Sequence, residues 1–314
     1  MSDAVFDNTQ RANPEAIKPP KRNIDGVLLV DKPSGPTSNA VLQRVKGRLN
    51  ARKAGHTGSL DPMATGLLPL CLGEATKLSS YLLDADKHYH FTAQLGVCTD
   101  TGDADGTPVA TRRVPPLTRE DLTAILADFS GEQLQIPPMY SALKHHGQRL
   151  YTLARRGETV ERPPRRVTIH RLVLLDGGQD WFAAYVHCTK GTYIRTLALD
   201  IGEALGCGAH LVALRRTGAG PFVDAPLVTL AAVEDDPEGV LARHLLPVDT
   251  AVAHWPALHL EEAAAARVCS GQTVALEVPV AAGWVRLYRG SDAFIGLGEV
   301  VGHRVRPKRL MATA

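Results

Sequence analysis

The sequence predicts an α+β fold, with one large domain followed by a smaller one. Its 314 residues exceed the most common size of a single domain and suit two. Apolar residues alternate with polar ones in several segments, as at Tyr89, Phe91 and Ala93, which is typical of strands with one buried face. Other segments, such as 118–130, repeat apolar residues at helical spacing, which indicates helices that pack on one side.

The first elements follow a polar arm. Residues 1–24 carry prolines and no apolar pattern, and they are expected to be disordered. A buried strand is predicted over 26–30, because this apolar run stops at the turn-forming stretch 31–36. Ser38 is expected to cap the next helix, whose apolar side chains share one face: Val41, Leu42, Val45 and Leu49.

The middle of the chain alternates between strands and helices. A helix is predicted near 74–82, and the alternating strand 88–97 follows it. The next helix covers 118–130, with Thr118 as its cap and Gly131 at its end.

Residues 132–165 differ in composition from the segments around them, because they are rich in proline and basic residues. They are expected to form an insertion. After it, strands are predicted over 167–175 and 181–188. A helix then begins at Thr192, and another strand is expected near 210–214.

The composition changes again past Pro247, so a domain boundary is placed near residue 250. It separates a large domain, 25–249, from a small one, 250–314. The small domain is expected to hold a helix over 261–268 and short strands.

Composition limits the classes of function. The formal net charge is only +2, so a nucleic-acid role has to come from local basic patches. The five cysteines contain no CxxC pair, which argues against a structural zinc site and a disulfide framework and favours a reduced, cytoplasmic setting. No apolar run is long enough for a membrane span, and the N-terminal stretch lacks the apolar core of a secretory signal.

Several common catalytic patterns are missing. The sequence has no GxxxxGK[ST] loop, no HExxH pair and no GxSxG elbow. The acidic loop 100–106 fails the EF-hand pattern, because Thr101 and Arg112 stand where acids are required. It is therefore expected to be a solvated turn between strands.

A basic cluster stands out between residues 144 and 171. A solvated helix face is the plain interpretation of such a cluster, and a nucleic-acid groove is the alternative. The groove is favoured because the cluster lies in a proline-bounded insertion between strands. The cluster consists of Lys144, Arg149, Arg155, Arg156, Arg162, Arg165, Arg166 and Arg171.

Arg195 follows the strand-to-helix turn at Gly191 and Thr192. Its position is one residue off the apolar stripe of the predicted helix. It is either an exposed arginine at the rim of the helix or an arginine aimed at a carboxylate or phosphate at the end of the sheet.

Asp61 is the single acid in the stretch GHTGSLDPMATGLLPLCLG, residues 55–73. Taken alone it is favoured as a helix N-cap, because Pro62 suits the first position of a helix. A cap does not need the small residues of 55–58, which let the backbone approach a ligand. The absence of a second nearby acid argues against a glycosidase-type pair and suits a nucleophile or a single base.

Taken together, six stretches of the chain resemble bacterial tRNA pseudouridine-55 synthases of the TruB type. They occur in the order of that family and span about residues 25–250. A shorter resemblance, to a PUA-type RNA-binding domain, covers 294–300 and 305–310. The six stretches are 26–33, 55–83, 87–91, 137–144, 190–197 and 206–216.

The resemblance implies a pseudouridine synthase fold. Its central sheet is mixed but mostly antiparallel and flanked by helices, with an RNA-gripping insertion and a small PUA-like β domain. It implies isomerisation of a T-loop uridine of tRNA without a metal or an organic cofactor. No guide RNA is expected, because of the insertion at 132–165, and nothing in the sequence demands more than a monomer. The target nucleotide has to be flipped out, because this chemistry cannot proceed inside a stacked loop.

The resemblance also implies roles for particular residues. Asp61 is the catalytic carboxylate, Arg195 pairs with it, and Tyr89 packs against the flipped base. His56 fills the space that flipped bases leave, and Leu214 lines the uracil pocket. Contacts with substrate or RNA are implied for His56, Lys32, Tyr193, Leu214, Lys77, Arg155, Arg156, Arg165 and Arg166.

Three other functions share some of these features. A noncatalytic RNA chaperone is disfavoured as the sole role by the set Asp61, Tyr89 and Arg195. The catalytic subunit of a guide-RNA complex shares the core motifs, but the insertion at 132–165 favours a stand-alone enzyme. A metal-dependent hydrolase would need ligand clusters that the sequence patterns do not show.

Overall fold

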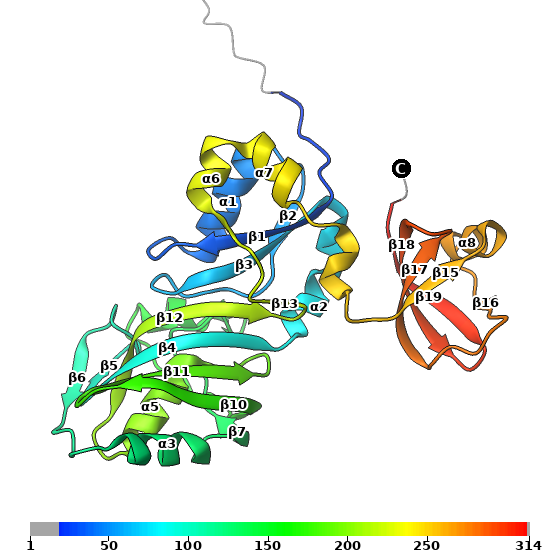
Figure 1. Cartoon of the computed structure of the whole chain (residues 1–314). Helices are drawn as coiled ribbons and strands as arrows, with labels where there is room; N and C mark the ends of the chain where they lie inside the picture. The colour runs from blue at the N-terminus through cyan, green and yellow to red at the C-terminus, as the bar shows by residue number, and fades with distance from the viewer. Residues whose placement is uncertain (1–18, 313–314) are drawn as a thin grey trace, which may run out of the picture.

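The computed structural model describes residues 19–312, and within them ten strands form one large mixed sheet (Figure 1). The order along the sheet is β14-β1-β3-β12-β4-β11-β10-β7, with β2 added beside β3 and β13 beside β12. The pairs β1–β14 and β3–β12 are parallel, and the others are antiparallel. The predicted mixed, mostly antiparallel sheet is therefore confirmed.

The strands of this sheet, in chain order, are β1 (Gly26–Lys32), β2 (Ala54–His56), β3 (Thr65–Leu72), β4 (Lys87–Leu95), β7 (Gly131–Gln135), β10 (Arg165–Gly177), β11 (Trp181–Cys188), β12 (Ala209–Ala219), β13 (Phe222–Val223) and β14 (Val228–Thr229). Two short hairpins lie outside it: β5 (Val97–Thr99) with β6 (Pro108–Thr111), and β8 (Lys144–His145) with β9 (Gln148–Arg149).

Helices cover the sheet in three groups, each with its own buried cluster. α3 and α5 pack on one face of β12, β4, β11 and β10. α1, α6 and α7 cover one face of β1 and β3, while η1, α2 and η2 cover the other. Their bounds are α1 (Ser38–Arg48), η1 (Gly73–Leu78), α2 (Ser79–Asp84), α3 (Arg119–Asp128), α5 (Ile194–Ala204), α6 (Leu230–Asp235), α7 (Pro237–His244) and η2 (Val248–Val252); the short α4 (Leu150–Ala154) follows β9.

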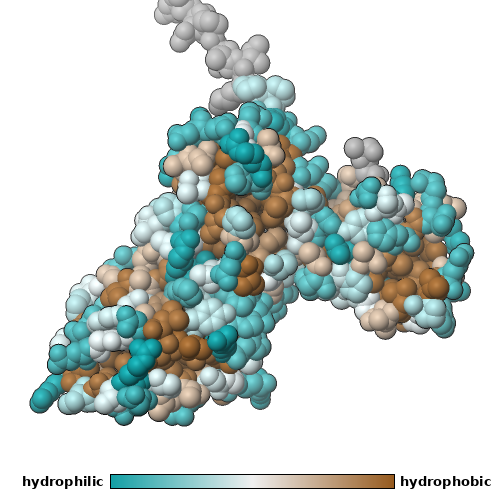
Figure 2. All heavy atoms as spheres, viewed as in Figure 1, coloured by the Kyte–Doolittle hydropathy of each residue, from teal (hydrophilic) through white to brown (hydrophobic). Residues whose placement is uncertain are grey.

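A second, five-stranded sheet forms the smaller lobe, seen at the right of Figures 1 and 2. Its order is β15-β17-β18-β19-β16, and α8 packs against it in a separate buried cluster. Tyr81 of α2 contacts Trp255 and Trp284, the second of which lies on a strand of this lobe, with its ring edge to face. The bounds are β15 (Ala257–Leu260), α8 (Glu262–Cys269), β16 (Val274–Ala275), β17 (Gly283–Arg289), β18 (Ala293–Val301) and β19 (Arg304–Leu310).

Two predicted boundaries fall within regular elements of the structure. The boundary near residue 250 falls inside η2, whose Ala251 and Val252 are buried against the larger part. The start of the expected insertion at 132–165 belongs to the sheet, because β7 pairs with β10. The predicted arm, 1–24, lies mostly outside the described residues. No helix within 19–312 has the length and apolar character needed to cross a membrane.

Ser38 does not cap α1. The cap is Thr37, whose hydroxyl accepts a hydrogen bond from the Ala40 amide. Ser38 is instead buried in the first turn, where its hydroxyl accepts from the Leu60 amide (2.8 Å) and lies 3.1 Å from the Leu60 carbonyl. The helix is thereby attached to the residue directly before Asp61.

Candidate active site

Asp61 lies on a tight turn rather than at a helix end. Its carbonyl accepts from the Ala64 amide at 3.1 Å, and the next regular element is the strand β3. The predicted N-cap role of Asp61 is therefore wrong. Pro62 occupies the second position of this turn, which its fixed φ suits as well as it suits the start of a helix.

Lys32 stabilises this turn by hydrogen bonds to its carbonyl groups. Its side chain is fully buried, and the ammonium donates to the carbonyls of Pro62 (2.9 Å), Ala64 (2.7 Å) and Pro33 (3.0 Å). Burial lowers the pKa of Lys32 to about 8, and the Asp61 carboxylate opposes that fall. Lys32 thus supports the backbone that directly follows the candidate carboxylate.

Replacing Lys32 with methionine is expected to lower the free energy of unfolding by about 2–4 kcal/mol, because buried carbonyls lose their donor. The unfolded chain binds the Lys32 proton up to about the ordinary pKa of 10.5, whereas the folded chain releases it near 8. The unfolded state therefore binds more protons between these values, and wild-type stability should rise with pH there. Urea unfolding at neutral and alkaline pH measures both effects. An unchanged free energy of unfolding in the variant would contradict the first, and an unchanged dependence of that free energy on pH would contradict the second.

Arg195 and Asp61 form a two-pronged ion pair. Nε lies 2.9 Å from one carboxylate oxygen, and Nη2 donates to the other at 3.2 Å. The Arg195 side chain is 5% exposed and that of Asp61 is 37% exposed, so the carboxylate is the part that an incoming molecule can reach. Of the two interpretations of Arg195 from the sequence, the arginine aimed at a carboxylate matches this geometry.

Backbone carbonyls fix the remaining donors of Arg195. Nη1 donates to the Thr101 carbonyl at 2.8 Å, and Nη2 donates to the Tyr140 carbonyl at 2.7 Å. Because each contact comes from a different segment, the guanidinium orientation depends on three loops at once. A planar fork of this kind cannot be replaced by the point charge of a lysine.

Asp103 is the part of the site that the sequence did not reveal. It lies in the acidic loop 100–106, predicted to be solvated, yet its side chain is only 6% exposed and one oxygen is 3.6 Å from Nε of Arg195. Its other oxygen accepts from the Thr101 hydroxyl (2.5 Å) and the Asp105 amide (3.2 Å). The buried arginine therefore faces two carboxylates.

These charges act on Asp61 in opposite directions. Burial raises the pKa of its carboxyl above the ordinary value; Arg195 and Lys32 oppose that rise, whereas the Asp103 carboxylate adds to it. Because the buried carboxylate is less strongly solvated than a surface aspartate, its pKa is higher and the group is more reactive. Arg195 thus orients the group and limits the cost of burying its charge.

Tyr89 and Arg216 lie opposite each other on β4 and β12. Burial raises the pKa of the Tyr89 hydroxyl, and the charge and hydrogen bond of Arg216 oppose this rise. Arg216 is 1% exposed, and it donates to the carbonyls of Leu67 (2.7 Å) and Gly58 (3.1 Å). This arginine, unassigned in the sequence, joins the predicted tyrosine to the loop that precedes Asp61.

His56 and Leu214 border the same region. His56 lies on β2, and its Nδ1 is buried without a hydrogen-bond partner among residues 19–312. Burial lowers the pKa of His56, and the Arg216 charge lowers it further, so the ring is neutral at neutral pH. Leu214 is buried in the same cluster as Leu60 and Ala64, which flank the Asp61 turn.

Tyr193 is the residue before α5 and has no side-chain cap of its own. Its amide donates to the side-chain oxygen of Gln135 (2.7 Å), whose amide nitrogen donates to the Tyr193 carbonyl (3.1 Å). Gln135 ends β7, so the edge strand fixes the start of the helix that carries Arg195.

Lys77, for which contact with substrate or RNA was predicted, makes two polar contacts within the protein. Its ammonium pairs with Glu74 (2.6 Å) and donates to the Leu310 carbonyl (3.0 Å). It therefore connects η1 to the last strand of the second sheet. Its position within a family-like stretch gave no indication of this structural role.

The predicted basic residues lie in and beside the insertion. The Arg155 guanidinium lies over the Tyr151 ring, while Arg156 pairs with Glu158 (3.0 Å). Arg165 and Arg166 begin β10, and Arg166 pairs with Glu132 (3.3 Å). All four are exposed.

The fold and this site define the class of the protein: a mixed sheet presents an arginine-paired aspartate on a turn beside a half-buried tyrosine, as expected for a pseudouridine synthase. The chain belongs to the TruB family of pseudouridylate synthases. Its residues match three models of that family, "TruB family pseudouridylate synthase (N terminal domain)" over 46–194, "tRNA pseudouridylate synthase B C-terminal domain" over 195–253, and "Pseudouridine synthase II TruB, C-terminal" over 256–311.

Similar proteins support this assignment. A tRNA pseudouridine synthase B of Azoarcus sp. is 55% identical over 297 residues, 94% of this chain and 98% of the relative. One of Coxiella burnetii is 51% identical over 296 residues, 93% and 96% of the two chains. Among solved structures, an H/ACA RNP bound to a substrate RNA has a TM-score of 0.71 at 26% identity, covering 92% of this chain and 85% of the other. A Cbf5-Nop10-Gar1 complex has a TM-score of 0.70 at 28% identity, covering 91% and 84%.

Proposed function

We propose that this protein isomerises the T-loop uridine at position 55 of tRNA to pseudouridine, with Asp61 as its catalytic carboxylate. The observation that supports this most strongly is the two-pronged pair between Asp61 and the buried Arg195, at 2.9 and 3.2 Å. Relatives named tRNA pseudouridine synthase B are 51% and 55% identical to it over 93% and 94% of its length.

The reaction leaves the atomic composition of the substrate unchanged. The bond between N1 of uracil and C1′ of ribose breaks, the uracil rotates, and a bond forms between C5 and C1′. The proton on C5 is lost, and N1 gains a proton. Asp61 acts as the nucleophile, and the bond that it forms to the substrate breaks again before the product leaves, while Arg195 keeps the carboxylate ionised and aimed. Because uridine and pseudouridine have the same oxidation level, the reaction needs no oxidant or reductant.

Flipping the nucleotide is the second part of the proposal. Tyr89 and Leu214 supply an apolar wall for the base, and the wall excludes water that could trap the detached sugar. The buried Nδ1 of His56 lacks a partner among the described residues, and RNA entering the site would supply one. The carboxylate of Asp61 remains accessible at 37% exposure.

We further propose that the protein works without a guide RNA. The full-length relatives named tRNA pseudouridine synthase B are 51–55% identical to it, whereas the H/ACA and Cbf5 structures are 26–28% identical. The exposed segment from Lys144 to Glu161 provides a basic surface of the chain's own.

Tritium release from tRNA labelled at C5 of uridine tests the proposed function. The pure protein should release about one tritium per unmodified tRNA transcript without any added guide, because the C5 proton leaves as the new bond forms. A transcript with cytidine at position 55 is the matched control and should release none above background. Remodelling of tRNA without tritium release would favour a chaperone, and release only with a guide would favour the guide-dependent class.

Neutralising the insertion arginines is expected to weaken RNA binding and flatten its dependence on salt. Removing one arginine–phosphate interaction should reduce the slope of log K against log salt by about 0.7–0.9. Fluorescence anisotropy over a salt series measures this. The variant replaces Arg155, Arg156, Arg165 and Arg166 with glutamine.

A control with the same change in charge replaces four exposed arginines near α1 and α7, which already pair with acids or carbonyls: Arg22, Arg44, Arg48 and Arg243. It should keep the wild-type slope. Equal slopes for both variants would show that the insertion is not the electrostatic contact.

A further inference from the structure

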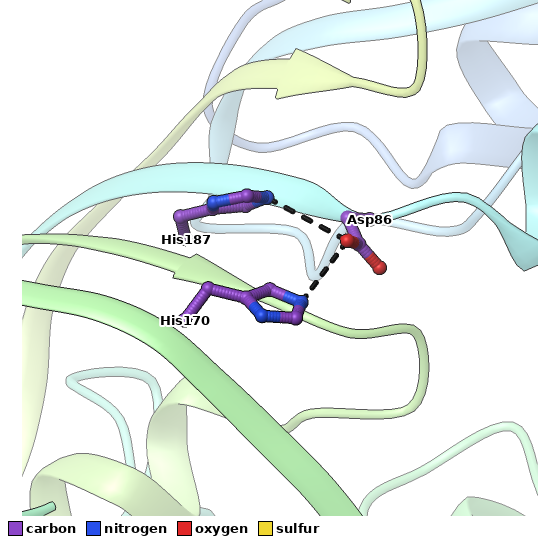
Figure 3. A group of neighbouring side chains, drawn as sticks. All are labelled: Asp86, His170 and His187. Carbon is purple, nitrogen blue, oxygen red and sulfur yellow. Dashed lines mark ion pairs between the residues drawn. The ribbon is translucent and has the colours of Figure 1, made fainter. Parts of the chain in front are cut away.

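Asp86, His170 and His187 bring three metal-type ligand atoms together on the outer face of the sheet (Figure 3). Nε2 of His170 is 3.0 Å from one Asp86 oxygen, and Nε2 of His187 is 3.6 Å from the same oxygen. All three ligand atoms lie within 4.8 Å of one another. The side chains are 30–42% exposed, so solvent reaches the group.

This group lies on the opposite side of the sheet from the cluster that packs on α3 and α5. Along β11, Val186 and Cys188 belong to that cluster, so the alternating side chain of His187 projects from the other face. Tyr89 packs against the same cluster as Val186. The three ligands are therefore separate from the site around Asp61.

A β-bulge positions His170. The register of β10 against β11 shifts between Ile169 and Arg171, so His170 is an extra residue in β10. As a result His170 and Arg171 are both exposed, whereas regular alternation would bury one of them. Bulges commonly re-aim a side chain near a functional site, and this one directs His170 toward Asp86.

His187 is held in place before any ligand binds. Its ring stacks on His88, its cross-strand neighbour, with centroids 4.1 Å apart and planes 8° apart. Nδ1 of His88 lies 2.6 Å from the Tyr185 hydroxyl, which fixes the stacking partner in turn. A fixed imidazole loses less entropy on binding a ligand than a mobile one.

We propose that Asp86, His170 and His187 bind one divalent transition-metal ion of the zinc type. Imidazole nitrogen with carboxylate oxygen is a donor set that Zn²⁺ accepts, and three protein ligands leave the fourth position to water. Bond lengths of about 2.0–2.1 Å in a tetrahedron place ligand atoms about 3.3 Å apart. The two separations from Asp86 lie on either side of that value.

A metal here would join three strands. His170 lies on β10, His187 on β11, and Asp86 directly precedes β4. The Asp86 carbonyl also accepts from the Gly220 amide (3.0 Å), next to the end of β12. Binding would therefore stabilise the folded sheet, in proportion to the metal concentration relative to its dissociation constant.

Competition with a chromophoric chelator tests the proposal on the tag-free, chelator-treated full chain. Wild type should bind one Zn²⁺ in the competition, and the melting temperature should rise as Zn²⁺ is added. Asp86→Asn, His170→Ala and His187→Ala should each weaken binding by at least about tenfold and remove the thermal shift. Visible spectra with Co²⁺ should show coordination by nitrogen and oxygen in wild type alone.

His90→Ala is the matched control, because His90 is an exposed histidine of β4 outside the ligand group. It should keep wild-type affinity and spectrum. Absence of Zn²⁺ binding in wild type would overturn the proposal and leave a simple pair of histidine–aspartate contacts. Zn²⁺ affinity equal to that of wild type in all three ligand variants would also overturn it, since the ion would then bind elsewhere.

Discussion

Asp61→Asn is expected to abolish pseudouridine formation while tRNA binding stays close to wild type. The amide has nearly the size of the carboxylate, so the turn and its contacts with Lys32 persist, but it cannot act as a nucleophile. Loss of a nucleophile removes most of the rate acceleration, so turnover should fall by at least about 10⁴-fold. Tritium release gives the rate, and fluorescence anisotropy gives the affinity for the same tRNA.

The control for this variant is Asp105→Asn, which removes an exposed acid from the loop that also holds Asp103. It should retain activity within a few-fold of wild type. Turnover of Asp61→Asn near that of Asp105→Asn would exclude Asp61 as nucleophile. If binding falls as far as turnover, the carboxylate serves the RNA complex rather than the chemistry.

Arg195→Lys is expected to reduce kcat by about 100-fold with little change in tRNA affinity. Lysine retains the positive charge, but it cannot contact both Asp61 oxygens and the carbonyls of Thr101 and Tyr140 together. The carboxylate would then be misaligned, and small misplacements of a reacting group cost on this order. Single-turnover rates at saturating enzyme separate this loss from any loss of binding.

Arg195→Met should have the larger effect and a distinct pH profile. Arg195 opposes the rise that burial causes in the pKa of Asp61, so its removal should raise that pKa further. As the pH is lowered, the variant should therefore lose activity at a higher pH than wild type does, because the carboxylate becomes protonated earlier. An unshifted acid limb would show that Arg195 does not control the charge of Asp61.

Arg44→Lys is the matched control for the arginine variants. Arg44 makes the same two-pronged contact, to Glu234 at 2.7 and 2.8 Å, but on the exposed surface. Exposed pairs of this kind contribute little to stability. Wild-type activity in Arg44→Lys would attribute the Arg195 effect to its place in the site.

Local patterns in the sequence were enough to predict most elements and the residues that could react. The alternation from Tyr89 to Leu95 predicts β4, because side chains of a strand point to alternate faces. Asp61 stands out as the single acid in 55–73, and the family resemblance assigned Tyr89 and Arg195 to the same site.

Where a local pattern fits two conformations equally well, the sequence alone could not decide which of them forms. Pro62 is compatible with the start of a helix and with a turn. The turn forms because β3 joins the central sheet directly afterwards and Lys32, from β1, binds the carbonyls of Pro62 and Ala64. The contacts from Lys32 to Pro62 and Ala64 span 30 and 32 residues of sequence, so no local pattern contains them.

By itself, then, the sequence determined which segments form strands and helices, and which acid, arginine and tyrosine were candidates. Only the tertiary structure decided that Asp103 is buried beside Arg195, that Arg216 connects Tyr89 to the loop before Asp61, and that Lys77 connects η1 to β19. Secondary structure follows from side-chain periodicity within a few turns of chain. The charge environment of a buried group depends on desolvation and on partners from distant segments, which become neighbours only when the sheet is assembled.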